Sequence, residues 1–166
     1  LLGGLLLDPL RIPEVAEDVR EGDFFSARND AVYAALLRLA ERAEPVDYVS
    51  VGESLLAAGM LQSVGGRAYL VELTNCVTSA AHVKHHARIV RETAMLRRLI
   101  AESTEIVTEA YATRPDGESV QNLLDSSEDR IFRIVGERDK RGAEPMSKAV
   151  EETFRRIDSA THRSGL

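Results

Sequence analysis

The sequence contains few of the residues on which several common functions depend. It has no tryptophan, and only 5% of its residues are aromatic, too few ring faces for a base-stacking surface on nucleic acid. Its single cysteine, Cys76, excludes an internal disulfide and suits a reducing compartment. Its formal net charge of −6 argues against a simple electrostatic clamp on nucleic acid. Its longest apolar run falls far short of the roughly 20 residues that span a bilayer, so we expect no membrane partner.

The sequence does contain enough apolar material for a folded core. It is 44% hydrophobic and 29% charged over 166 residues, which excludes a disordered tail. A chain of this length removes roughly 70% of its unfolded surface from water on folding. That allows one domain, or one domain with an appendage. Because the chain starts with leucine inside an apolar stretch, we expect it to be a piece of a longer protein.

Short helices separated by breakers are predicted for residues 1–78. The predicted segments are residues 1–8, 13–19, 27–42, 48–59 and a last short helix around Leu70. Ser26 and Asp47 are good N-cap residues for two of them, and Gly65–Gly66 marks a turn before the last. We expect these residues to form a globular helical head. The absence of a long alternating strand pattern predicts an all-α protein.

Residues 79–138 have a different character, with two long amphipathic patterns. Ser79 is a candidate cap for a helix that continues to about residue 113, and a second helix covers residues 119–138. The turn Arg114-Pro115-Asp116-Gly117 joins them, so an antiparallel hairpin is predicted. Only one side of each helix can lie on the other, and the remaining apolar side chains must find another surface. We therefore expect self-association, with the following residues as the candidate hairpin packing or dimer face: Leu96, Ile131 and Ile134.

The last part of the chain is predicted to be a flexible linker, residues 139–145, followed by a separate helix, residues 146–166. The linker is charged, contains glycine and proline, and lacks a periodic apolar pattern. One narrow apolar stripe runs along the helix: Met146, Val150, Phe154 and Ile157. A single helix beyond a linker cannot bury such a stripe by itself. We expect the stripe to dock on another surface.

The sequence contains no convincing motif for catalysis, for a cofactor or for a metal ion. No glycine-rich phosphate loop is present. His82 and His86 have the spacing of a metal-ligand pair, but no third ligand is evident and we interpret them as surface histidines. We interpret the acidic row Glu102, Glu105 and Glu109, with Arg97 and Arg98 one turn earlier, as a solvated charged face. Cys76 is expected to face the core. A nucleophilic thiol would need an adjacent base, and none is evident beside it. We therefore predict no catalytic, cofactor-binding or metal-binding residue in this sequence.

Three stretches together resemble the N-terminal domain of DnaB-type bacterial replicative helicases. They are LLGGLLLDP at the start, EGDFFSARNDAVYAALLRLAERAEPVDYVSVGESL from residue 21, and GGRAYLVELTNCVTSAAHVKHHARIVRE from residue 65. The most specific signal is the last stretch, with EPVDYVSV upstream of it. The order and spacing hold along essentially the whole chain, and residues 146–166 are similar to the family's linker helix.

The resemblance implies a helical head followed by a hairpin that pairs with a second copy. Three such pairs would form a collar on a ring of six subunits, where primase docks and a helicase loader is a further partner. The linker helix would pack on the ATPase domain of the neighbouring subunit. ATP and Mg²⁺ would bind in that ATPase domain, which this sequence lacks, so the chain itself would be a non-catalytic scaffold with weak or no DNA binding. The resemblance also implies a bacterial cytoplasmic location.

Three other interpretations compete with this one. A helical regulatory or ligand-binding module of another multidomain protein would need a pocket with convergent polar groups. A small helical enzyme would need a nucleophile with a base, or a metal set. A DNA-binding domain would need a basic helix, whereas this chain is acidic.

Overall fold

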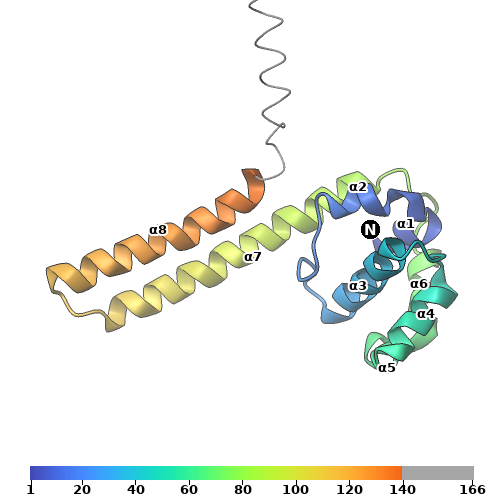
Figure 1. Ribbon diagram of the computed structural model, residues 1–166, viewed down its shortest axis with the longest axis horizontal. Coiled ribbons are helices and arrows are strands. Elements are labelled where there is room, and N and C mark those ends of the chain that lie inside the picture. The colour runs from blue at the N-terminus through green and yellow to red at the C-terminus, as the bar shows by residue number, and fades with distance from the viewer. Residues whose placement is uncertain (140–166) are drawn as a thin grey trace, which may run out of the picture. The chain divides into compact units, whose positions relative to one another are not determined.

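The computed structural model describes residues 1–139, and every element within them is helical, which confirms the all-α prediction. The elements are α1 (Leu2–Leu7), the 3₁₀ helix η1 (Pro9–Arg11), α2 (Ile12–Ala16), α3 (Ala27–Glu41), α4 (Tyr48–Ala57), α5 (Leu61–Val64), α6 (Gly66–Asn75), α7 (Val83–Ala112) and α8 (Gly117–Asp139) (Figure 1). Among these described helices, none has the length and apolar content needed to cross a bilayer. The predicted helix at 146–166, with Met146, Val150, Phe154 and Ile157, lies outside the described residues.

The chain forms two compact units, Leu1–Arg98 and Leu99–Leu166, and the division falls inside α7. The sequence-based division placed residues 79–138 in the hairpin. In the structure, the first part of α7 belongs to the head because Val83 and Ala87 are buried in the head's core, at 2% and 0% exposure. We refer to Leu1–Arg98 as the head and to residues 99–139 as the hairpin.

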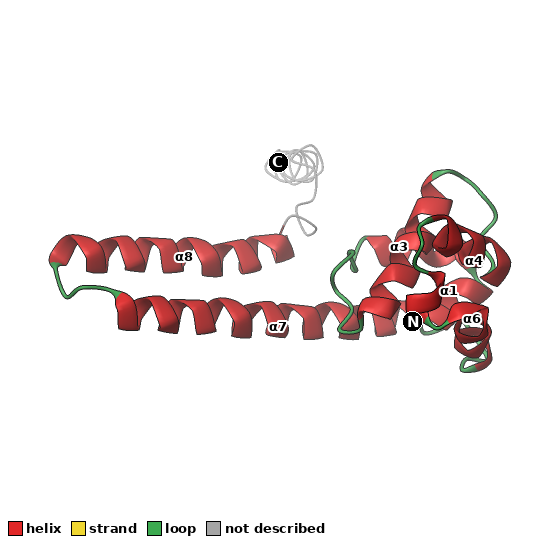
Figure 2. Ribbon diagram, turned by 90° about the horizontal axis from the view of Figure 1, so that it is seen from below, coloured by secondary structure: helices red, strands yellow, loops and turns green. Residues whose placement is uncertain are grey.

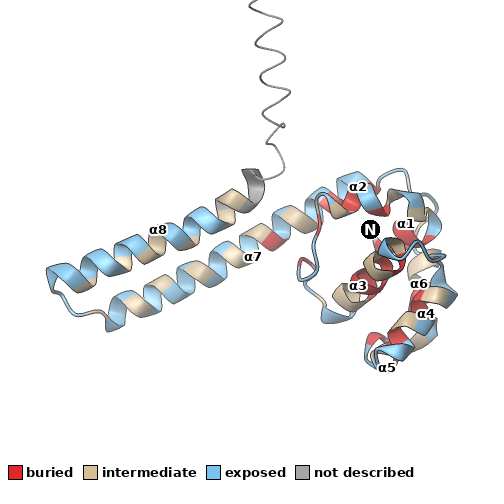
Figure 3. Cartoon of the chain, in the orientation of Figure 1, coloured by how far each residue is buried: buried red, intermediate tan, exposed pale blue. Residues whose placement is uncertain are grey.

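The head is built around one apolar cluster to which α1 to α6 and the start of α7 all contribute. Tyr33 on α3 is its largest fully buried side chain, and the Tyr33 hydroxyl donates a hydrogen bond of 2.9 Å to the carbonyl of Val19. Phe24 lies beside it, with 5.3 Å between the ring centroids. The buried residues coloured in Figure 3 gather on these helices. Within the described part of the chain, all buried residues therefore belong to the head.

Two adjacent glycines allow α1 to approach its neighbours closely. A Cβ on Gly3 would lie 2.0 Å from the carbonyl oxygen of Leu73 on α6, and a Cβ on Gly4 would lie 2.6 Å from Cγ1 of Val83. A side chain at Gly3 would collide with the backbone of α6, and one at Gly4 would require the Val83 side chain to shift. At Gly3 the apolar run contains a glycine because backbone meets backbone there.

Side-chain caps are found at the starts of two described helices, α4 and α8. The Asp47 carboxylate accepts hydrogen bonds of 2.8 Å from the N–H groups of Val49 and Ser50, which confirms it as the N-cap of α4. Ser26 stands at the N-cap position of α3, although its side chain makes no capping hydrogen bond. The prediction for Ser79 is wrong, because its hydroxyl accepts from the N–H of Ala81 in a local turn and α7 begins only at Val83.

In the hairpin, the C-terminal part of α7 and α8 lie side by side and run in opposite directions, as both ribbon views show (Figure 2). The predicted turn is confirmed at residues 113–116. Asp116 caps α8 by accepting a hydrogen bond of 2.7 Å from the N–H of Ser119. The helix starts two residues earlier than predicted, at Gly117.

Candidate self-association surface

The seam between the two hairpin helices is narrow and partly polar. Among the hairpin residues whose burial is described, those on the seam are only half-buried, and they include Ile106, Leu123 and Ile134. Arg130 on α8 donates a hydrogen bond of 2.6 Å to Glu109 on α7. This bond, with smaller contributions from Glu102 and Glu105, raises the pKa of Arg130. The acidic row is therefore not only a solvated face, because its last member pairs with the opposite helix.

The larger apolar side chains of the hairpin point to solvent. Those that are at least 36% exposed are Leu99, Ile100, Val107, Tyr111, Val120, Leu124, Ile131 and Phe132. On α7, Ile100, Val107 and Tyr111 are spaced by seven and four residues, so they share one face. Val120, Leu124 and Ile131 on α8 have the matching spacing of four and seven. No hairpin residue whose burial is described is buried, and α8 carries no buried colour in Figure 3.

The three hairpin residues singled out from the sequence differ in their surroundings. Leu96 is 60% exposed and lies on the part of α7 that belongs to the head. Ile131 is 36% exposed on α8, and Ile134 is half-buried in the seam. The sequence analysis missed Tyr111 and Phe132, which are 90% and 71% exposed. The four-residue step from Val107 to Tyr111 is a signal that could have identified the first of them.

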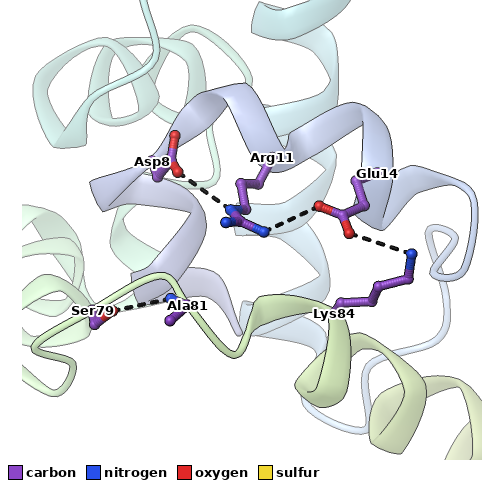
Figure 4. Close-up of polar contacts among 6 residues, drawn as sticks. All are labelled: Asp8, Arg11, Glu14, Ser79, Ala81 and Lys84. Atoms are coloured by element: carbon purple, nitrogen blue, oxygen red, sulfur yellow. Dashed lines mark hydrogen bonds and ion pairs between the residues drawn. The ribbon is translucent and has the colours of Figure 1, made fainter.

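Ion pairs tie the first half of α7 to the head. Arg11 forms ion pairs of 3.4 Å with Asp8 and 3.3 Å with Glu14, and Glu14 in turn lies 3.4 Å from Nζ of Lys84 on α7 (Figure 4). These side chains are partly exposed, and such pairs each contribute little stability in water. Their effect is to fix how α7 begins on the head.

A buried carboxylate strengthens the same attachment further along α7. Asp23 is 4% exposed, and Arg98 forms an ion pair with it. Arg97 donates a hydrogen bond of 2.7 Å to the Asp23 carbonyl, and Arg91 pairs with Asp18 at 2.9 Å. The assignment of Arg97 and Arg98 to a solvated charged face is therefore wrong. A buried carboxylate needs a cation, and Arg98 supplies it.

Two further candidate sites, Cys76 and the His82–His86 pair, lie at the surface of the head. Cys76 is exposed, which contradicts the expectation that it faces the core, because α6 ends at Asn75 and the cysteine lies beyond it. Tyr69 is 8% exposed, and its hydroxyl bonds to Asn29. His82 and His86 are both exposed. Among residues 1–139, no three His, Cys, Asp or Glu side chains converge as metal ligands.

Comparison with known families assigns the head to a described domain. Residues 1–92 match the family described as "DnaB-like helicase N terminal domain". The crystal structure of the N-terminal domain of DnaB helicase from Mycobacterium tuberculosis is similar, with a TM-score of 0.74 and 39% sequence identity. That similarity covers 80% of this chain and 91% of the other.

Full-length relatives extend the match almost to the last residue. The chain is 34% identical over 165 residues to the replicative DNA helicase DnaB of Geobacillus stearothermophilus, and 32% identical over 165 residues to the replicative DNA helicase DnaC of Bacillus subtilis. The alignments cover 99% of this chain but 36% of each relative, so the chain spans about a third of their length. On the head's family match and the similarity to the solved domain, the chain belongs to the family of DnaB-like helicase N-terminal domains.

Proposed function

We propose that this chain is the assembly and protein-interaction domain of a replicative DNA helicase, and that it pairs with a second copy through the exposed apolar face of its hairpin. The observation that carries the pairing is the burial pattern. The hairpin has no fully buried residue among those described, yet it exposes eight large apolar side chains. Contiguous exposed apolar surface of this kind marks protein–protein contacts.

The energetics favour pairing over an isolated hairpin. Two helices joined by a four-residue turn bury too little apolar surface to offset the entropy of ordering them. Burying one Leu or Ile side chain stabilises by roughly 1.5–3 kcal/mol, so a second hairpin that covers several of them supplies what the seam does not. Leu124 and Ile100, which are 58% and 65% exposed, are the residues from which we expect the largest contributions.

In the whole helicase, we propose that three pairs form a collar on a ring of six subunits, with primase and a helicase loader as partners. The support is the family membership together with the surface described above. We further propose that the stripe formed by Met146, Val150, Phe154 and Ile157 docks on the neighbouring subunit's ATPase domain. The parent protein acts on DNA in the bacterial cytoplasm, while this domain binds DNA weakly or not at all, in line with its net charge of −6.

Nucleotide chemistry belongs to another part of the parent helicase in this proposal. The sequence contains no phosphate loop, so none of its residues fits the phosphates of ATP or the accompanying Mg²⁺. The ATPase domain would bind both and would couple ATP hydrolysis to unwinding. This chain would supply the framework that holds the subunits together.

The test is sedimentation of the chain from low to high micromolar concentration. We expect reversible self-association that Leu124→Glu weakens by about tenfold or more, because the change buries a carboxylate in the apolar contact. Asn122→Glu is the matched control, since it adds the same charge at an exposed polar position on α8. It should leave association within about twofold of the parent chain. A chain that stays monomeric at high micromolar concentration, or equal effects of the two variants, would overturn the pairing.

A further inference from the structure

A groove lies between the C-terminal half of α3 and α4, wholly within the head, and no part of the proposed self-association uses it. Its volume is about 640 Å³, and residues 38–58 supply its walls. This volume is within the range of sites that bind small ligands or short peptide segments. Helices α3 and α4 pack on each other, and the chain between them closes one end.

One wall of the groove carries Arg38, and one nitrogen of its guanidinium group lacks a hydrogen-bond partner. Nη2 of Arg38 is buried and has no hydrogen-bond partner within the described residues. A buried guanidinium N–H without an acceptor is costly, so such a group calls for an explanation. Arg42 directly follows the last residue of α3 and also lines the groove, and its side chain makes no ion pair or hydrogen bond within residues 1–139. Two guanidinium groups thus line one groove with an acceptor missing.

The charge balance of the groove favours a carboxylate over a phosphate. Glu53 also lines the groove, but it is already paired with Arg67. Glu44 is the remaining acidic residue of the lining, and it makes no ion pair within the described residues. Two arginines and one unpaired glutamate leave a single positive charge. That charge matches a monoanion, and the planar guanidinium group fits a carboxylate in two-point contact.

The rest of the lining indicates what should flank the carboxylate. Leu39, Pro45 and Val49 give the groove an apolar component. Several lining residues are solvent-exposed, so the groove is open along its length and is not an enclosed cavity. An open groove suits a chain segment, whereas small ligands are usually enclosed over most of their surface.

We propose that this groove binds an acidic side chain, flanked by aliphatic residues, in an extended segment of a partner protein. The carboxylate accepts hydrogen bonds from Arg42 and, once its guanidinium group turns into the groove, from Arg38. The neighbouring aliphatic side chains lie on Leu39, Pro45 and Val49. Binding therefore requires both the negative charge and the apolar flanks.

The experiment is an NMR titration of the ¹⁵N-labelled chain with two capped tripeptides, acetyl-Leu-Asp-Leu-amide and its isosteric Asn counterpart. With the Asp peptide we expect saturable chemical-shift changes confined to α3, α4 and the chain between them. The Asn peptide should bind at least about tenfold more weakly. Arg38→Met keeps the aliphatic stem and should also weaken the Asp peptide about tenfold. Arg114→Met, which removes the same charge in the hairpin turn, should leave the affinity unchanged.

Two further ligands and one further variant keep the outcome decisive. If Arg38→Met disturbs the spectrum of the head, the test of the groove is the affinity of Arg42→Met for the Asp peptide, together with the comparison of the Asp and Asn peptides on the parent chain. Inorganic phosphate binding more tightly than the Asp peptide would assign the groove to a different anion. Propionate binding as tightly as the peptide would assign it to a small acid. Absence of saturable shifts, equal affinities for the two peptides, or shifts centred on α7 and α8 would each overturn the proposal.

Discussion

The head and the hairpin obtain their stability in different ways. The head buries large side chains completely, among them Leu36 and Leu55 at 0% exposure, and its helices approach as closely as glycine permits. Helices α7 and α8 are each longer than any of α1 to α6, yet no described hairpin residue is buried and the larger apolar side chains of the hairpin face outward. A long amphipathic helix is therefore no evidence of a core. The head is complete within one chain, and the hairpin has an apolar surface that a second chain can cover.

The same substitution in the two regions gives the largest contrast. Leu36→Ala removes a fully buried side chain on α3 and should lower the free energy of unfolding of the head by about 2–5 kcal/mol. Leu124→Ala removes a side chain that is 58% exposed, and in dilute solution it should change stability by less than about 0.5 kcal/mol. Urea denaturation of both variants at low protein concentration measures the difference.

The Leu124→Ala variant also has a concentration-dependent signature. At high micromolar concentration its stability should fall below that of the parent chain, because the second copy no longer buries that side chain. Leu36→Ala should lose the same free energy at every concentration. If Leu124→Ala proved as destabilising as Leu36→Ala in dilute solution, the contrast between a self-contained head and an incomplete hairpin would fail.

Replacing one glycine in each region by alanine should change stability in opposite directions. Gly3→Ala places a Cβ 2.0 Å from the Leu73 carbonyl oxygen, so α1 must move away from α6, and we expect a loss of about 1–3 kcal/mol. Gly136→Ala on α8 meets no atom within 4 Å, and alanine is the better helix former there. It should stabilise the hairpin by about 0.5–1 kcal/mol. Thermal melts followed by circular dichroism should show the first variant melting earlier than the parent chain and the second no earlier.

How far the sequence predicts the fold depends on whether the signal is local. Asp47 and the turn before Gly117 set helix starts through contacts within a few residues, and both were predictable. The start of α7 was not, because Val83 begins the helix where it packs against Gly4, 79 residues away in sequence. The Arg98 ion pair with Asp23 joins residues of similar separation and leaves no local pattern.

The self-association surface of the hairpin was also only partly predictable, because it depends on contacts between helices. Periodicity predicted amphipathic patterns on both hairpin helices, but it did not separate the residues of the seam from those on the outer face. In the structure Ile106 is half-buried in the seam and Val107 is 54% exposed. Adjacent residues differ by about 100° around a helix, so the partner helix decides which of them is covered. The Arg38 groove was not found from the sequence, because its two walls come from different helices.

The last contrast concerns the two capping aspartates, one in each region. Asp47→Ala removes the cap of α4 and should lower the head's stability by about 1 kcal/mol at neutral pH. Asp116→Ala removes the equivalent cap of α8 and should leave the head's unfolding unchanged, since it acts in the other unit. NMR signals of the buried methyl groups of Val51 and Leu55 report on the head alone. A head that unfolds earlier in Asp116→Ala would show that the two units unfold together.

The dependence of the Asp47 contribution on pH gives this prediction a second check. Hydrogen bonds from the N–H groups of Ser50 and Val49 lower the pKa of Asp47 below its usual value of about 3.8. A carboxylate with a lowered pKa in the folded state stabilises fully above the unfolded pKa and loses that contribution as the pH falls through the folded pKa. The stability difference between the parent chain and Asp47→Ala should therefore be constant from pH 7 to pH 5 and shrink below about pH 4. Asp47→Asn keeps a neutral cap of similar quality, so its difference from Asp47→Ala should persist into acid, which separates loss of the charge from loss of the cap.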